Sequence, residues 1–418
     1  MQTTLAPEFA NTPEGREAEA ILRKCVHCGF CNATCPTYQL LGDELDGPRG
    51  RIYLMKQVLE GSTPTRATQL HLDRCLTCRN CETTCPSGVQ YGHLVDIGRR
   101  IVDERVPRPA AERALRWTLK EGLPSPLFAP AMRLGQTVRG LLPASLRAKV
   151  PERSPAGHWP VRNHARKILL HANCVQPAMQ PGINAATARV LDAAGIQTLL
   201  APNEGCCGAV RFHMNDQDGG RAQLRALIDA WWPLVEGRDG QAGVEAIVSN
   251  VSGCGLMLKE SAHVLRHDPA YADKAARMAS LLRDLSEMLP ELAPALLAAH
   301  PDGLGRGRSL TYHPPCTLQH GQRVRDTVET WLPRLGFALQ RAASEAHLCC
   351  GSAGTYSVTQ PELSQQLRDR KLGQLQGRGD VIVSSNIGCI THLQSGTATP
   401  VRHWIEVLDA ALGGQPDL

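Results

Sequence analysis

Sixteen cysteines carry most of the chemistry that this sequence could perform. Eight of them fall in two copies of the pattern C-x2-C-x2-C-x3-C-P, which run from Cys25 to Pro36 and from Cys75 to Pro86. The other eight lie further along the chain, several of them in adjacent pairs. A chain of 418 residues is not the short secreted type that is held together by disulfides. The clustered cysteines therefore predict metal or redox sites.

The two runs have the spacing of bacterial two-cluster ferredoxins. Three cysteines of a run wrap one cluster, and the fourth is carried to the other cluster as a helix begins at the following proline. The sequence thus predicts two [4Fe–4S] clusters with crossed ligands. One set is Cys25, Cys28, Cys31 and Cys85, and the other is Cys35, Cys75, Cys78 and Cys81. Zinc is the alternative, although it favours two spaced pairs of ligands.

The stretch between the two runs predicts a helix. Between Arg51 and Leu59 the apolar residues follow the helical period. We therefore expect residues 1–104 to form a helical ferredoxin-type domain, which holds its clusters between helices and not beneath a small sheet.

Residues 105–167 form a basic, proline- and arginine-rich connector. They contain thirteen basic and three acidic residues, a net charge of +10, so the rest of the chain carries −5. Three roles are open for this segment: a solvated connector, a docking site for a partner subunit, or contact with an anionic membrane. We expect Arg108, Arg113 and Arg116 to face a partner or a membrane.

The remainder of the chain is an internal repeat, with copies expected at residues 168–305 and 306–418. Each copy has a cysteine after an apolar run, then Cys-Cys-Gly (CCG), then a second apolar run that leads to a last cysteine. Short apolar runs that alternate with helical segments predict buried parallel strands in an α/β layer. Ligands bind at the carboxyl ends of such strands. The expected fold class is therefore an α+β multidomain chain, with a helical domain followed by a pseudo-twofold pair of α/β domains.

Each copy offers four cysteines for a cluster, a metal ion or redox chemistry, and buried structural thiols are the alternative. The two groups are Cys174, Cys206, Cys207 and Cys254, and Cys316, Cys349, Cys350 and Cys389. His171 and His313 each precede the first cysteine of a group by three residues. We expect them to support a metal site or to contact a quinone, and a hydrogen-bonded residue at a strand end is the alternative.

Two CCG copies behind a two-cluster ferredoxin domain resemble the iron–sulfur subunits of membrane-associated respiratory dehydrogenases. With GDELDGPRGRIYLMK between the cysteine runs, the chain is most similar to glycolate oxidase iron–sulfur subunits. Broader relatives are the small subunit of anaerobic glycerol-3-phosphate dehydrogenase, lactate-utilisation proteins and heterodisulfide reductase subunits. The fullest CCG motif ends in CxxC, but Val251 and Asn386 stand at the first position of that pair, so the full non-cubane ligand set does not carry over.

This resemblance implies an electron-transfer subunit of a flavin-dependent 2-hydroxy acid (glycolate) dehydrogenase. The sequence shows no dinucleotide-binding, P-loop or HExxH motif, and oxidation of a 2-hydroxy acid needs a flavin or nicotinamide. FAD is therefore expected on partner subunits only, with a membrane quinone as a possible acceptor. The alternatives are a glycerol-3-phosphate or lactate dehydrogenase subunit and a self-contained heterodisulfide or thiol reductase.

Composition and apolar segments give an expectation of location. The first twenty residues lack the apolar region of a signal peptide, and no run reaches the roughly 20 apolar residues of a membrane span. We expect a protein on the cytoplasmic side, peripheral at the inner membrane. Aromatic residues are only 4% of the chain, so we expect no nucleic acid partner.

Overall fold

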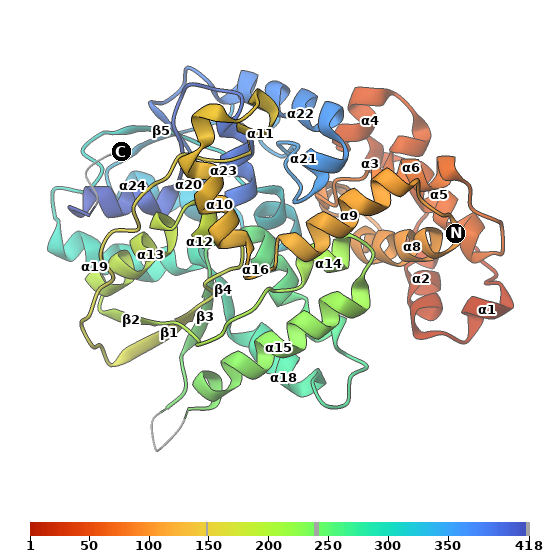
Figure 1. The fold of residues 1–418 in the computed structure, drawn as a ribbon, viewed down its shortest axis with the longest axis horizontal. Helices are drawn as coiled ribbons and strands as arrows, with labels where there is room; N and C mark the ends of the chain where they lie inside the picture. The colour runs from red at the N-terminus through yellow and green to blue at the C-terminus, as the bar shows by residue number, and fades with distance from the viewer. Residues whose placement is uncertain (148, 238–241, 415–418) are drawn as a thin grey trace.

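The computed structural model describes residues 1–147, 149–237 and 242–414. Helices make up the first part of the chain, and two four-stranded sheets with covering helices make up the rest (Figure 1). This confirms the expected fold class, in which a helical ferredoxin-type part precedes two α/β units.

The ferredoxin-type part is entirely helical in the residues that the structure describes, with no strand before Arg166. The predicted helix between Arg51 and Leu59 is the greater part of α5 (Pro48–Leu59). The other elements are α1 (Pro7–Ala10), α2 (Pro13–Lys24), α3 (Phe30–Ala33), α4 (Pro36–Leu41), η1 (Glu44–Asp46), α6 (Arg66–Asp73), α7 (Asn80–Thr84) and α8 (Tyr91–Arg105). Helices α2, α5 and α8 bury their apolar faces against one another and form the core of this part.

The two cysteine runs adopt the same backbone path. Positions two and four after the first cysteine take positive φ in both: 60° and 87° at His27 and Gly29, and 52° and 58° at Thr77 and Arg79. These left-handed residues bend each loop so that its first three cysteines face one centre.

The helix that is predicted to begin after the fourth cysteine is present in the first run and absent in the second. Cys35 is followed directly by Pro36, the first residue of α4. The expected helix at Pro86 is absent, because Pro86 lies in a turn with Gly88 at φ 63° and the next helix begins at Tyr91. A residue in the left-handed region cannot continue a right-handed helix.

The basic connector forms short helices on the surface of the molecule, on the side that faces the viewer in Figure 1. These are α9 (Ala110–Gly122), α10 (Phe128–Thr137), η2 (Arg139–Leu141) and α11 (Ala144–Arg147). Neither α9 nor α10 contains a buried residue. The side chain of Gln136 holds α10 to the body through hydrogen bonds of 3.4 and 3.3 Å to the carbonyls of Ala178 and Met179.

The second half of the chain contains two sheets with identical topology, which confirms the predicted repeat. Their strand orders are β2-β1-β3-β4 and β6-β5-β7-β8, and all neighbouring strands are parallel. The strands are β1 (Arg166–Leu170), β2 (Ile196–Leu199), β3 (Ala246–Ser249), β4 (Leu282–Asp284), β5 (Ser309–Tyr312), β6 (Ala338–Arg341), β7 (Val381–Ser384) and β8 (Val401–His403).

Helices cover both sheets and join the two copies. They are α12 (Gln176–Met179), α13 (Gly182–Ala193), α14 (Ala209–His213), α15 (Gln217–Glu236), α16 (Ser252–Lys259), α17 (Ser261–Val264), α18 (Ala272–Leu281), η3 (Leu285–Met288), α19 (Leu289–Ala299), the π-helical turn η4 (Thr317–Gly321), α20 (Thr327–Arg334), α21 (Tyr356–Thr359), α22 (Pro361–Leu375), α23 (Ile387–Gln394) and α24 (Trp404–Ala411). The last helix of each copy packs on the other copy: α24 on α13, and α19 on α20. Arg189 of α13 donates to both carboxylate oxygens of Asp409 in α24, at 2.9 and 2.6 Å. One apolar core therefore contains residues of both sheets.

Candidate metal and redox sites

The first predicted cluster set surrounds a small cavity near the surface. This cavity, of about 30 Å³, is lined by Cys25, Cys28, Cys31 and Cys85, and also by Cys81. Cys28 is exposed, and its loop neighbours Val26 and Phe30 are 67% and 62% exposed. Cys85, the fourth cysteine of the second run, thus reaches the loop of the first run. This face of the site is open to a partner.

The second predicted set surrounds a deeper cavity of about 20 Å³. It is lined by Cys35, Cys75, Cys78 and Cys81. Cys35 comes from the first run, so cysteines of both runs line this cavity, and the crossed ligand assignment stays a prediction. The four thiols of each predicted set match the donor chemistry of an iron–sulfur cluster.

A buried ion pair that sequence reasoning missed supports the second cavity. Arg51 is fully buried and donates to the carbonyl of His71 at 2.7 Å and to Thr37 Oγ1 at 3.1 Å. Its guanidinium also lies 3.4 Å from Asp46 Oδ1 and 4.0 Å from Cys35 Sγ. Both charged residues belong to the GDELDGPRGR stretch between the runs, which is the signal that could have pointed to them.

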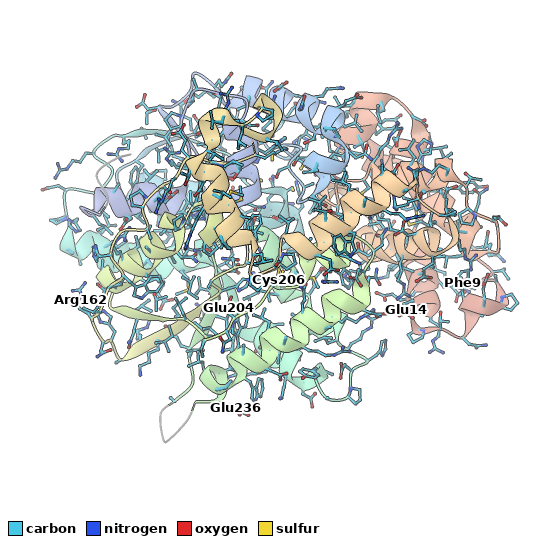
Figure 2. The ribbon with its side chains drawn as sticks, viewed as in Figure 1. Phe9, Glu14, Arg162, Glu204, Cys206 and Glu236 are labelled. Atoms are coloured by element: carbon cyan, nitrogen blue, oxygen red, sulfur yellow. The ribbon has the colours of Figure 1, made fainter. Side chains whose placement is uncertain are left out.

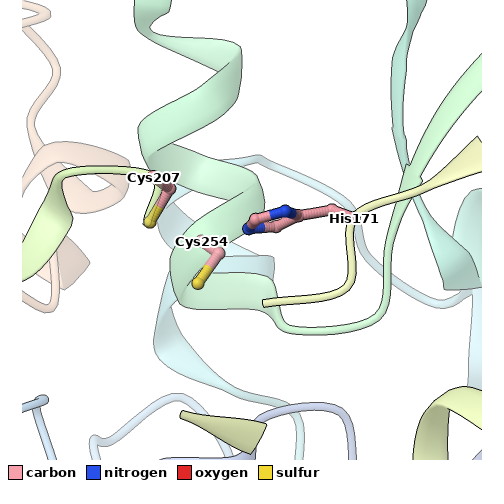
Figure 3. A group of neighbouring side chains, drawn as sticks. All are labelled: His171, Cys207 and Cys254. Carbon is pink, nitrogen blue, oxygen red and sulfur yellow. The ribbon is translucent and has the colours of Figure 1, made fainter. Parts of the chain in front are cut away.

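The first CCG group forms where the carboxyl ends of β1 and β3 meet the loop after β2. His171 follows β1, Cys207 lies in the loop, and Cys254 lies in the first turn of α16 (Figure 3). Their ligand atoms all lie within 4.8 Å of one another. Cys174 Sγ lies 3.4 Å from Cys206 Sγ, and Cys206 also contacts Cys207. The four predicted cysteines therefore form one continuous group near the centre of the molecule, where Figure 2 labels Cys206.

Glu204 gives this group a buried anion that sequence reasoning did not identify. Its carboxylate accepts a hydrogen bond from His171 Nδ1. Burial opposes the charged form of His171, but Glu204 and Cys254 outweigh burial and raise its pKa to about 10. A hydrogen bond from the Cys174 thiol lowers the pKa of Cys206 to about 3. The only sequence signal is the position of Glu204 two residues before the Cys-Cys pair, and His347 stands there in the second copy.

The second CCG group repeats this geometry with a different charge environment. The ligand atoms of His313, Cys350 and Cys389 lie within 4.8 Å of one another, and Cys316 Sγ lies 3.7 Å from Cys349 Sγ. Burial lowers the pKa of His313 well below its ordinary value. The buried charge near these thiols is the ammonium of Lys371, which donates to the carbonyl of Glu345 at 2.5 Å.

A central cavity of about 350 Å³ connects these sites. Its walls are mostly apolar, and they include the cluster-2 loop at Leu76, Thr77 and Arg79 and the connector at Leu119 and Leu123. Both CCG groups contribute, through Cys174, Cys206, Cys207, Cys254, Cys316, Cys349 and Cys389. Apolar walls with a few polar groups are typical of a small-molecule site.

The second cluster site is also packed against the second CCG group. Cys78 packs against a buried cluster that contains Leu76, Cys316 and Cys349. The two halves of the chain are joined here by hydrogen bonds from Asn80 Nδ2 to the carbonyl of His347, at 3.3 Å, and from the Tyr356 hydroxyl to the carbonyl of Arg74, at 3.1 Å.

The connector arginines do not all lie where the sequence suggested. Arg108 is buried and donates to both carboxylate oxygens of Asp73, at 2.6 and 3.0 Å, so it is bound within the chain and does not face a partner. Arg116 is half-buried beside the same carboxylate, and Arg113 is exposed. The carboxylates of the ferredoxin-type part thus neutralise part of the connector's charge.

In the part of the chain that the structure describes, every helix is too short or too polar to cross a lipid bilayer.

Comparison with known proteins identifies the two halves. Residues 21–89 match a family model described as 4Fe-4S dicluster domain, and residues 168–259 and 310–394 match the CCG cysteine-rich domain. The chain is 52% identical to the glycolate oxidase iron-sulfur subunit of Escherichia coli over 99% of both chains. It is 29% identical to the probable glycolate oxidase iron-sulfur subunit of Bacillus subtilis over 93% of this chain and 92% of that protein. Lactate utilization protein A of Bacillus licheniformis is 24% identical over 58% of this chain and 99% of its own length.

Proposed function

Because the chain belongs to the family of glycolate oxidase iron–sulfur subunits, we propose that it carries electrons from a partner-bound flavin to a membrane quinone. The complex would be a flavin-dependent dehydrogenase of 2-hydroxy acids, with glycolate as the substrate. The observation that carries this proposal is the order of the sites along the molecule. An exposed cluster loop comes first, then a buried one, and that buried loop lines a large apolar cavity.

We assign the two cluster sites by the cysteines that line each cavity. Cluster 1 is assigned to Cys25, Cys28, Cys31 and Cys85, and cluster 2 to Cys35, Cys75, Cys78 and Cys81. Bound there, [4Fe–4S] clusters supply one-electron transfer. The chain's own part is to hold the two clusters side by side, since Cys81 lines both cavities.

The surface around cluster 1 is suited to receive the flavin-binding subunit. Val26, Phe30 and Tyr53 are exposed apolar residues beside the cluster loop, with 67%, 62% and 46% of their surface accessible. Exposed aromatic and apolar side chains that lie together mark protein contacts. Cys28 is exposed in the same loop, so a docked flavin would face the least protected ligand.

The central cavity is suited to the acceptor. A quinone ring is apolar with polar oxygens, and the cavity offers apolar walls with Thr77, Arg79 and Gln176 among them. Leu119 and Leu123 of the connector form part of one wall, so the connector lies directly beside this cavity.

We propose that the connector places this cavity at the membrane. Beyond the cavity wall it exposes Trp117, Leu127, Leu134 and Leu141, at 62%, 74%, 66% and 87%. Arg113, Arg133 and Arg147 are exposed on the same short helices. Apolar side chains among arginines are typical of segments that lie in the interface of an anionic membrane.

A disulfide or thiol reductase is the second candidate, because thiols of both CCG groups line the central cavity. One experiment separates the two. In the first assay, the chain is purified anaerobically with its partner subunits and supplied with glycolate and a short-chain quinone. In the second assay, the chain is purified alone and supplied with reduced ferredoxin and a disulfide. Quinone reduction that needs the flavin subunits supports the first proposal, whereas disulfide reduction by the chain alone supports the second. Lactate and glycerol 3-phosphate in place of glycolate test the substrate.

A further inference from the structure

Two arginines and a tyrosine lie against the cysteines that we assign to cluster 2. Tyr91, the first residue of α8, is 3% exposed and donates its hydroxyl to Cys75 Sγ at 3.6 Å. The guanidinium of Arg51 in α5 is fully buried and lies 4.0 Å from Cys35 Sγ. Arg99 of α8 donates to the carbonyl of Cys75 at 2.6 Å. Donors from two helices thus reach two of the four cysteines of this set.

The positive charge beside these cysteines exceeds that of the carboxylate that faces it. Arg51 shares the Asp46 carboxylate with Arg74, at 3.4 and 2.8 Å. Arg99 is 8% exposed, and its hydrogen bonds within the described residues go to backbone carbonyls. The carboxylate of the nearby Asp73 is bound by another arginine. Three guanidiniums are thus balanced by one carboxylate on this side of the cavity.

The cysteines that we assign to cluster 1 have a different environment. In the part of the chain that the structure describes, the N–H and O–H groups that donate to cluster cysteines' sulfurs all reach the cluster-2 set. Cys31 Sγ instead lies 3.9 Å from the side-chain oxygen of Asn32, which can only accept. Arg49 lines the cluster-1 cavity, but it is one-third exposed and donates to both carboxylate oxygens of Glu44, at 2.6 and 3.0 Å. Its charge is therefore neutralised and screened by water.

This difference acts on the reduction potentials of the two sites. Reduction adds one negative charge to an iron–sulfur cluster, so hydrogen bonds to its sulfurs and nearby positive charges raise its potential. Burial has the opposite effect, because it removes water from the added charge. At cluster 2 the buried guanidiniums and the hydroxyl replace that water, and they act where the low dielectric strengthens charge interactions.

We propose that Tyr91, Arg51 and Arg99 raise the reduction potential of cluster 2 above that of cluster 1. The inference rests on the proposed electron-transfer function and adds a direction to it. The higher potential of the inner site favours the transfer of one electron inward, so that cluster 1 is oxidised and cluster 2 is reduced beside the central cavity. The three residues act by positioning charge and hydrogen bonds, and they carry no electron themselves.

The test is a redox titration of the full chain, purified anaerobically with both clusters, in which electron paramagnetic resonance follows each cluster. Cys75→Ser identifies the cluster-2 signal by its loss, because Cys75 belongs to that cluster whether or not the ligand sets are crossed. In wild type this signal should appear at the higher potential. If the cluster-1 signal appears at the higher potential, the proposal is wrong.

Tyr91→Phe removes the hydroxyl and keeps the ring. It should shift the distribution of the electron between the clusters about tenfold toward cluster 1, which equals a change of about 59 mV in the potential of cluster 2. The potential of cluster 1 should stay as in wild type. Tyr271→Phe removes the same group from a tyrosine of the first CCG copy, where the hydroxyl donates to Asp229, and is the matched control. An unchanged potential of cluster 2 in Tyr91→Phe would overturn the proposal.

Arg99→Met tests the charge, because its removal leaves no carboxylate unpaired. It should lower the potential of cluster 2, whereas Arg99→Lys keeps the charge and should titrate as wild type does. Arg100→Met changes the next residue of α8, which is 22% exposed, and should leave both potentials unchanged. Iron content shows whether each variant keeps both clusters, and if Arg99→Met does not, Tyr91→Phe and the wild-type order of potentials decide. None of these measurements uses the flavin subunits or a quinone, so a failure of quinone reduction and a failure of this proposal are distinguishable.

Discussion

The guanidinium of Arg79 donates to both carboxylate oxygens of Glu260, which lies 181 residues later in the chain. Arg79 lies in the cluster-2 loop, between Cys78 and Cys81. Glu260 is the C-cap residue of α16, the helix that carries Cys254. His93 of α8 also contacts Glu260, with its Nε2 at 3.2 Å. One half-buried carboxylate thus fixes the ferredoxin-type part against the first CCG copy.

This ion pair predicts a loss of stability in acid. Burial opposes the charged form of Glu260, but His93 and Arg79 outweigh it and hold the pKa of Glu260 well below its usual value. A depressed folded-state pKa contributes stability above the unfolded value of about 4.3, and this contribution is lost as the pH falls toward the folded value.

Glu260→Gln should therefore destabilise the protein at pH 7, by about 3–5 kcal/mol, because Arg79 is left buried and unpaired. The difference from wild type should be constant above pH 5 and should shrink as the pH is lowered below about 4.3. Anaerobic thermal unfolding across this range measures both, with the exposed Glu104→Gln as the control. A difference that does not depend on pH would show that the charge of Glu260 is not what stabilises the contact.

The crossed ligand sets predict paired spectra. Cys35→Ser and Cys75→Ser should damage the same cluster, and Cys85→Ser and Cys25→Ser the other. Each variant should lose up to half of the cluster iron, and the spectra of reduced protein should match within each pair and differ between the pairs. If Cys35→Ser instead matched Cys25→Ser, each run would hold its own cluster.

The exposed loop of cluster 1 predicts the surface that binds the flavin subunit. Phe30→Asp should weaken association at least tenfold, because it replaces an exposed apolar contact with a charge. The iron content and cluster spectra should stay as in wild type. Leu200→Asp changes a half-exposed leucine that follows β2, in the first CCG copy, and is the matched control. If the two variants bind the flavin subunit equally well, the docking surface does not include the loop of cluster 1.

The connector predicts salt-sensitive binding to lipid. Trp117→Ser and Leu127→Ser should each lower affinity for anionic vesicles by about tenfold, since burial of such a side chain contributes about 1.5–3 kcal/mol. Binding should also fall with salt, because Arg113, Arg133 and Arg147 add electrostatic attraction. Sedimentation with anionic and neutral vesicles measures both effects. If vesicle binding is absent but the flavin subunit binds less well to these variants, the connector is a subunit contact.

Glu406 predicts a loss of stability as the pH rises toward neutrality. It lies in the first turn of α24, where its carboxylate accepts from the backbone N–H of His403 at 3.0 Å. Burial raises its pKa to about 7, with Asp409 adding to the shift and the His403 N–H and Arg402 opposing it. The folded state then holds a proton that the unfolded state releases, so stability falls as pH rises from about 4.3 to 7.

Glu406→Gln keeps the acceptor and removes this titration. The variant should gain stability relative to wild type between pH 5 and pH 8, as measured by thermal unfolding. If the difference in stability between the variant and wild type is constant over that range, the raised pKa of Glu406 does not affect stability.

The amino-acid sequence determined the local features of this protein. Cysteine spacing predicted which residues gather around each cluster cavity. Three cysteines that are spaced three residues apart in one short loop must lie close to one another. Apolar periodicity predicted α5, and the repeat of short apolar runs predicted the two parallel sheets, because both signals come from residues close together in the chain. The prediction that a helix begins at the proline after each fourth cysteine was correct at Pro36 and wrong at Pro86. Gly88, two residues after Pro86, has a left-handed conformation that a right-handed helix cannot contain.

Tertiary structure decided which distant residues meet. Glu204 reaches His171 across 33 residues, Arg108 reaches Asp73 across 35, and Arg79 reaches Glu260 across 181. No spacing rule connects such pairs, because their approach depends on how whole helices and sheets pack. The central cavity arises in the same way: its walls come from the ferredoxin-type loop, the connector and both CCG copies, and no one segment of the sequence contains it.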